Sequence, residues 1–292
     1  LENAIFSRAD FRGAYVLGAN LTGADLENAD MRQGGDLSGE TGASVARGQG
    51  PGTHNTVFSG SILRDTNMSN SRAAGADFSD ADLSGVTIHD ANFEGANFEG
   101  ANLAEADFTG SSLRHANLKA SIMTNAVIDM SQMDEANVDG VMHEDHTGAK
   151  LEELGDALPE LLKEHTQWIA TAGKAGERLD LSGFDLRNVP DLKGYKLTAI
   201  KAVMTNFILQ DLEGAEVQSA ILDKSDFRDC NLKKADFRGT SLKQAKLSRA
   251  NLSEALLSPL KFPSGDGQQW LQRADLSGAN LRHAILRGTD LS

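Results

Sequence analysis

One short stretch of the chain gathers side chains that could bind a metal ion. Residues 143–146 read His-Glu-Asp-His, so two imidazoles and two carboxylates fall within four positions. A zinc metalloprotease helix carries its two histidines four residues apart, which puts both imidazoles on one face. Here the histidines are three residues apart, in a segment where the surrounding pattern breaks down. We therefore interpret this stretch as a polar linker and predict no metal site.

The other residues that could do chemistry favour packing over catalysis. His165 and Trp168 stand three positions apart in a stretch with helical spacing, which predicts an aromatic packing contact on one helix face. Cys230 is the single cysteine and occupies a position otherwise held by small residues, so we expect it to point inward. No phosphate-binding glycine loop or nucleophile elbow occurs, and the many aspartates recur too regularly to single out a catalytic pair. The sequence predicts a protein that is not an enzyme and needs no cofactor.

A five-residue repeat positions these side chains. It is most regular over 76–140, where every unit has an apolar centre although only 40% of the chain is hydrophobic. The centres are Phe78, Leu83, Ile88, Phe93, Phe98, Leu103, Phe108, Leu113, Leu118, Met123, Ile128, Met133 and Val138. A small residue, mostly alanine, stands two positions before each centre. Residues two apart in an extended segment point the same way, so both face inward and the residue between them faces outward.

A period of five fits neither a helix nor a flat strand, but it fits a short extended segment followed by a turn. A chain that repeats the same corner, with its apolar pair always inward, must wind into a solenoid. The units ANFEG, ANLAE and ADFTG resemble the repeat of pentapeptide-repeat proteins. This resemblance implies an all-β solenoid, a right-handed quadrilateral β-helix with four repeats per coil. Phe58, Phe78 and Phe98 are then expected to stack in one column, with Phe207 below Phe227.

Interruptions of the repeat divide the chain. The residues between 34 and 56 are rich in Gly, Ser and Thr, which favours a tolerated surface loop over a loop that contacts a partner. The repeat phase slips by one residue at 189–192. The predicted segments are an acidic β-helix over 1–146 with a loop insertion at 34–56, an amphipathic helical linker or cap over 147–176, and a second β-helix over 177–292 with an insertion at 258–273.

Apolar residues at outward positions predict a docking surface near the end of the first repeat region. Ile122 and Met142 occupy normally polar positions on one side of the coil, with Val127 and Met130 on the next side. Exposed apolar columns of this kind usually have a covering element. The predicted helix has an apolar face, so we expect it to pack on this helix-docking patch and cap the first β-helix.

The two halves of the chain differ in charge. The net charge is −14, and all of it lies in residues 1–146, which hold 8 Lys or Arg and 22 Asp or Glu. This imbalance predicts two charged surfaces. The candidate acidic interaction face comprises Asp77, Asp82, Glu94, Glu99 and Asp107. The candidate basic patch comprises Lys224, Arg228, Lys233, Lys234, Arg238, Lys243 and Lys246.

These features favour a non-enzymatic rod for protein–protein interaction or scaffolding, as one region of a larger protein. The alternative is a DNA-mimicking inhibitor or protector of a topoisomerase such as gyrase, because the charge density of the first β-helix approaches that of duplex DNA. Some pentapeptide-repeat proteins act in this way. We expect a protein partner, or a second copy bound through the β-helix ends, and no direct nucleic-acid binding. With no transmembrane run, no signal peptide and one cysteine, a cytoplasmic, bacterial-type protein is expected.

Overall fold

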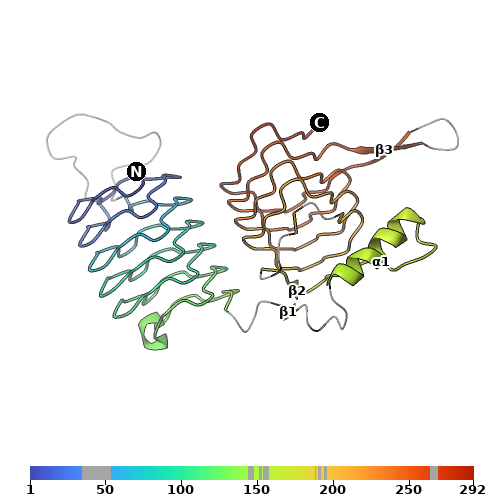
Figure 1. The fold of residues 1–292 in the computed structure, drawn as a ribbon. Coiled ribbons are helices and arrows are strands. Elements are labelled where there is room, and N and C mark those ends of the chain that lie inside the picture. The colour runs from blue at the N-terminus through green and yellow to red at the C-terminus, as the bar shows by residue number, and fades with distance from the viewer. Residues whose placement is uncertain are drawn as a thin grey trace. The chain divides into compact units, whose positions relative to one another are not determined.

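A computed structural model of the chain divides into two compact units, Leu1–His146 and Thr147–Ser292. Figure 1 shows each unit as a stack of coils, the first in blue to green and the second in yellow to red. The structure describes residues 1–34, 54–143, 148–150, 153, 158–187, 189, 192–193, 196–263 and 269–292. The finer division into two β-helices and a linker stays a prediction.

Few residues form named elements, because each side of a coil is only one repeat long. Within the described residues the elements are the 3₁₀-helix η1 (Met130–Met133), the α-helix α1 (Leu158–Ala170), and the strands β1 (Ala149–Lys150), β2 (Phe184–Asp185), β3 (Leu260–Pro263) and β4 (Gln269–Gln272). β1 pairs with β2 in parallel, and β3 pairs with β4 antiparallel.

The predicted quadrilateral β-helix is confirmed, with residues of neighbouring coils paired in parallel twenty positions apart. Asp77 bridges Asn97, which bridges Asn117 one coil further on. Between the coils, the Phe78 amide donates to the Asn97 carbonyl at 2.7 Å. Within a coil, the Ala81 amide donates to the Phe78 carbonyl at 3.0 Å and closes the turn. Every repeat therefore makes one rung to the next coil and one corner.

The apolar centres fill the inside of each unit. Phe58, Phe78 and Phe98 are buried and form the expected column, with ring centroids 5.1 and 5.3 Å apart and nearly parallel planes. In the second unit Phe207 stacks on Phe227 at 4.6 Å. The column arises because residues twenty apart occupy the same place on successive coils, at about the 4.8 Å spacing of neighbouring strands.

The corners need a left-handed backbone, which glycine, asparagine and aspartate adopt most readily and which many residues two positions after a centre adopt here. Asp90 and Gly110 occupy successive corners of one column, with φ of 51° and 75°. A Cβ built on Gly110 would overlap the Asp90 carboxylate, so a larger residue there would displace that side chain in addition to adopting a positive φ. Gly95 also has a positive φ, at 66°, but nothing lies within 4 Å of the place of its Cβ.

The two ends of the first insertion pair with each other where the insertion leaves the coil. Gly34 bridges His54 antiparallel, and the coil resumes where Val57 pairs with Tyr15. The Thr56 hydroxyl oxygen accepts the Gly13 amide at 2.9 Å, which fixes the base of the insertion to the first coil. The rest of the predicted loop, residues 35–53, lies outside the described residues.

The second unit begins with the predicted phase slip, which is confirmed by the register of its coils. Asp180 pairs with Lys201 and Asp185 with Asn206, both twenty-one positions apart. From Lys196 onward the pairing returns to twenty positions. One extra residue therefore lies within the first coil, between 185 and 196.

The α-helix packs on the second unit. Leu162 lies in the same buried cluster as Leu179 and Leu181, and Leu158 and Leu161 pack against that cluster. The expectation that this helix caps the first β-helix through the helix-docking patch is therefore wrong, because its apolar face is used on the coils that follow it in sequence. No helix of the described residues has the length and apolar composition needed to cross a membrane.

His165 fixes the helix in place through its two ring nitrogens. Nδ1 accepts the backbone amide of Leu179 at 3.1 Å, and Nε2 lies 2.9 Å from the Thr198 carbonyl oxygen. The ring is buried and stacks on Trp168, and the Arg178 guanidinium lies over the same indole. These two bonds require a neutral imidazole that carries its proton on Nε2.

Candidate interaction sites

The predicted metal-capable stretch is only partly visible. His143 is half-buried at the end of the last described coil of the first unit, and residues 144–146 lie outside the described residues. Among the residues that the structure describes, no group of three or more His, Cys, Asp or Glu side chains is arranged to hold a metal ion. Cys230 is buried as expected, its thiol donates to the Phe207 carbonyl at 2.8 Å, and burial raises the pKa of the thiol well above its usual value.

The five residues of the candidate acidic interaction face do not share a face. Asp77 and Glu99 lie on one side of the coil, and Asp82, Asp107 and Glu94 each lie on a different one of the other three sides. This corrects the grouping made from sequence. Residues five positions apart move to the next side, and only residues twenty apart stack. A run of carboxylates that is compact in the sequence is therefore distributed around the solenoid.

Two of these carboxylates are held by neighbours on their own side. Asp82 is buried and accepts from the Arg64 guanidinium and the Asn102 amide. Asp107 accepts from the Thr109 hydroxyl at 2.6 Å and lies 2.9 Å from the His89 imidazole. These bonds, with that of Thr109 the larger, lower the pKa of Asp107 to about 2. Both carboxylates therefore connect neighbouring coils through side-chain contacts on the surface of the unit.

The candidate basic patch is dispersed in the same way, so this grouping is also corrected. Its members occupy all four sides of the second unit: Lys224 and Lys243 on one, Arg228 and Lys246 on the next, Lys233 and Lys234 on the third, and Arg238 on the fourth. Several are already paired with carboxylates, at 2.7 Å for Arg228 with Asp226 and 2.6 Å for Arg238 with Asp236.

A short sequence signal accounts for the arginine pairs. Arg228 and Arg238 each stand two positions after an aspartate, with an apolar centre between, and their Nε and Nη2 atoms form a fork on that carboxylate. The same aspartate also accepts the backbone amide of its arginine. A residue before and a residue after one inward centre both point outward on one side. The spacing Asp-apolar-Arg therefore predicts a local ion pair.

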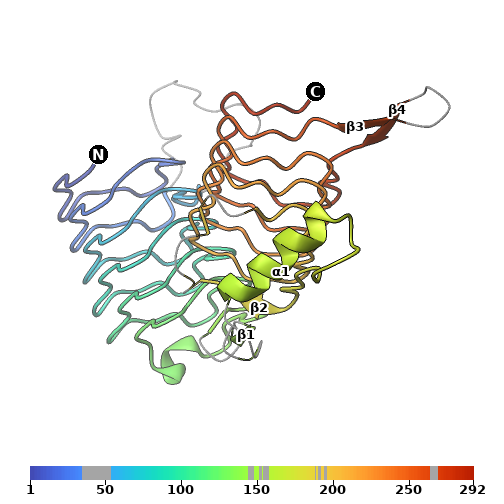
Figure 2. The same cartoon turned by 45° about the vertical axis from the view of Figure 1, so that its right-hand side comes forward.

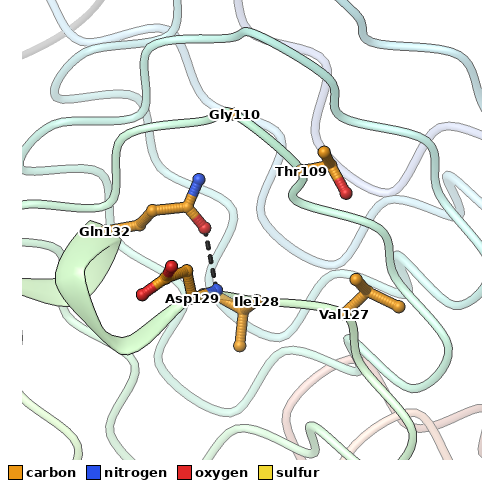
Figure 3. Close-up of a pocket in the computed structure, with 6 residues that line it drawn as sticks. All are labelled: Thr109, Gly110, Val127, Ile128, Asp129 and Gln132. Atoms are coloured by element: carbon orange, nitrogen blue, oxygen red, sulfur yellow. Dashed lines mark hydrogen bonds between the residues drawn. The ribbon is translucent and has the colours of Figure 1, made fainter.

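The helix-docking patch lies beside an open groove of the first unit. Ile122 is buried and pairs with Met142, while Val127 is 55% exposed on the next side. Met130 begins η1, the turn that interrupts this coil. Figure 3 shows the groove, which is lined by Thr109, Gly110, Val127, Ile128, Asp129 and Gln132. Its mixed lining offers one exposed aliphatic side chain, and the use of the patch as a docking surface stays a prediction.

The second insertion contributes a feature that the sequence reasoning did not identify. β3 and β4 form a hairpin that projects from the coils of the second unit (Figure 2). Phe262 and Trp270 face each other across the two strands, with ring centroids 5.1 Å apart and exposures of 37% and 58%. The glycines between the two apolar runs are a hairpin signal that was available in the sequence.

The base of the hairpin is fixed to the solenoid. The Gln272 side-chain amide donates to the Gly239 carbonyl at 2.6 Å, and its oxygen accepts from the Ser219 hydroxyl at 3.3 Å. Leu260 and Gln272 would contact any side chain placed at Gly239. The aromatic pair therefore stands on an anchored base, so its position relative to the coils is defined.

Family models for this repeat match most of the chain. Two models described as pentapeptide repeats match, the first over 1–33, 88–125, 101–140, 220–258 and 268–292 and the second over 54–97. No curated protein sequence matches the chain.

Solved structures with similar coils include two proteins that span nearly the whole chain. One is HetL, a pentapeptide repeat protein involved in heterocyst differentiation regulation from the cyanobacterium Nostoc sp. strain PCC 7120. It is 21% identical, with 100% of this chain and 88% of that chain covered and a TM-score of 0.35. The other is QnrB1, a plasmid-mediated fluoroquinolone resistance protein. QnrB1 is 15% identical to this chain, with 96% of this chain and 89% of that chain covered and a TM-score of 0.31.

Proposed function

The chain belongs to the pentapeptide-repeat family, and we propose that it is a non-enzymatic scaffold that binds a protein partner through the β3–β4 hairpin. The observation that carries this proposal is the exposed aromatic pair on an anchored base. Large aromatic side chains are enriched at the centres of protein interfaces because they bury much area at little cost in conformational entropy. Phe262 and Trp270 are the exposed aromatic pair among the described residues of the second unit.

The charges beside the aromatic pair indicate the chemistry of the partner. Lys261 lies in β3 and Arg273 follows β4, and the described residues of the hairpin include no acidic side chain. A matching surface would have an apolar recess for the rings with carboxylates at its rim, where charge sets orientation and association rate. The stiffness of the coils supports this use, because a preformed surface loses little entropy on binding.

Site-specific photo-crosslinking in cells tests the proposal. A photoreactive phenylalanine at position 270 should crosslink to one defined protein. The same residue at position 224, an exposed lysine on a coil corner of the same unit, serves as the control and should not capture that protein. Identical crosslinked products at both positions would show that the hairpin is not the binding site.

The predicted alternative, a DNA mimic that acts on gyrase, is supported by the excess of 22 acidic over 8 basic residues in 1–146. The five carboxylates of the candidate acidic interaction face lie on four sides of the coil, so they do not form one row of charge. Competition with duplex DNA for purified gyrase separates the two functions. Displacement of DNA at low protein concentration, above that of a charge-matched acidic control, would favour mimicry.

A further inference from the structure

Three arginines of the first unit converge on one carboxylate. Arg12, Arg32 and Arg72 come from successive coils, and each places a guanidinium nitrogen near Asp30 Oδ2, at 3.9, 2.8 and 3.0 Å. These nitrogen atoms therefore lie within about 7 Å of one another, where like charges interact strongly. A second carboxylate, that of Asp10, pairs with Arg12 at 2.7 Å. Three positive charges thus face two negative charges.

The two forks leave hydrogen-bond donors directed outward. Arg12 uses Nε and Nη2 to hold Asp10, at 3.0 and 2.7 Å. Arg32 holds Asp30 in the same way, at 2.9 and 2.8 Å. A guanidinium has five N–H donors, so the Nη1 hydrogens of both groups point away from the forks. The three arginine side chains are 45 to 57% exposed, which makes these donors accessible from solvent.

The arrangement exists before any ligand binds. Asp10 and Asp30 also accept the backbone amides of Arg12 and Arg32, at 3.0 and 3.3 Å, so each fork is part of its own coil corner. The Arg12 side-chain bond lowers the pKa of Asp10 to about 2, and the Arg32 bond lowers that of Asp30, so both carboxylates are ionised at neutral pH. A planar cation held in this way loses little conformational entropy when it binds an anion.

The spacing of the coils selects the size of the anion. Guanidinium groups on adjacent coils repeat at about 4.8 Å. Two oxygens of one tetrahedral group can reach both with hydrogen bonds of about 2.8 Å. A long polyanion would also meet Glu94 and Asp134, which lie on the same side of the following coils, and their charges would repel it. A single compact oxyanion fits both constraints.

We propose that Arg12, Arg32 and Arg72 form a binding site for one tetrahedral oxyanion of the phosphate class. The group is supplied either by free inorganic phosphate or by a phosphorylated side chain of a partner. This site is separate from the hairpin and does not depend on the function proposed for it.

Isothermal titration with inorganic phosphate, against sodium chloride at matched ionic strength, tests the site. The wild-type chain is expected to bind phosphate, and Arg72→Gln is expected to weaken binding by about fivefold or more, since it removes a charge-assisted donor. Arg114→Gln is the matched control, because Arg114 lies on the same side and pairs one to one with Asp134 at 3.6 Å. It should bind phosphate as the wild type does.

Two results would overturn the site: no phosphate binding above the chloride control, or equal weakening by Arg72→Gln and Arg114→Gln. Circular dichroism checks that each variant is folded, and Arg12→Gln replaces Arg72→Gln if the latter is not. Titration with a phosphoserine peptide and its unphosphorylated form identifies the source of the group. Tighter binding of the phosphopeptide than of inorganic phosphate assigns the site to a phosphorylated partner, and equal binding assigns it to free phosphate.

Discussion

Replacing His165 should detach α1 from the second unit. His165→Ala removes the acceptor of the Leu179 amide and the donor to the Thr198 carbonyl, which are both beneath the helix. A buried polar group left without a partner costs about 1–3 kcal/mol. Loss of both bonds should therefore lower the free energy that holds the helix by about 2–6 kcal/mol.

The effect can be read from one tryptophan. Trp168 stacks on His165 with ring centroids 5.9 Å apart, so its emission reports whether the helix is docked. Trp270→Phe removes the other indole, so that Trp168 is the one tryptophan that emits. We expect His165→Ala to shift the Trp168 emission to longer wavelength at lower denaturant concentration than in the wild type. Lys163→Ala, at an exposed position of the same helix, should leave the curve unchanged.

The same contact predicts a dependence on pH. Burial lowers the pKa of His165 from its ordinary value of 6.5, and the nearby Arg178 charge adds to this, while the bond to Thr198 opposes it. The unfolded chain therefore binds a proton more readily than the docked helix does. The contribution of His165 is fully present above pH 6.5 and is lost as the pH falls through its depressed folded-state pKa.

Two results would refute this account of the helix. One is a Trp168 denaturation midpoint that does not fall as the pH is lowered from about 8 to about 5, the range in which histidine changes charge. The other is a denaturation curve for His165→Ala that coincides with that of Lys163→Ala. Either result would mean that the helix is held by its apolar residues alone.

Two further predictions concern the coils. Gly110→Ala should lower the melting temperature more than Gly95→Ala, because both replace a left-handed glycine but only the first displaces the Asp90 carboxylate; equal shifts in differential scanning calorimetry would contradict this. Phe78→Ala should lower the free energy of unfolding by about 3–5 kcal/mol in chemical denaturation, because the ring is buried between two stacked partners. A loss below about 1 kcal/mol, as for a surface change, would show that the column does not support the core.

The inward-facing side chains could be predicted from the sequence because the same packing constraint recurs in every repeat. An apolar centre and a small residue must share a face in every unit, so a single phase error would put the whole set outside. The stacking of Phe78 on Phe98 and the inward direction of Cys230 both follow from that rule. The slip before Lys196 was visible because the phase of the centres changes there.

The grouping of the outward-facing side chains was harder to predict. Polar positions tolerate many residue types, and the repeat does not determine which charged residues lie side by side. Asp77 and Asp82 are close in sequence yet lie on adjacent sides. Counting by twenty would have separated them, and the Asp-apolar-Arg spacing would have identified Arg228 as paired. The apolar face of α1 showed that the helix needs a surface, but not which of the two units supplies it.

The affinity of the crosslinked partner for the hairpin is the most direct test of the proposed function. Isothermal titration of the purified partner should show binding at least about tenfold weaker for a chain with Phe262→Ser and Trp270→Ser, as expected when an aromatic hot spot is removed. Lys234→Ser, an exposed change elsewhere on the same unit, should bind like the wild type. Equal affinity for all three chains would contradict the role of the hairpin.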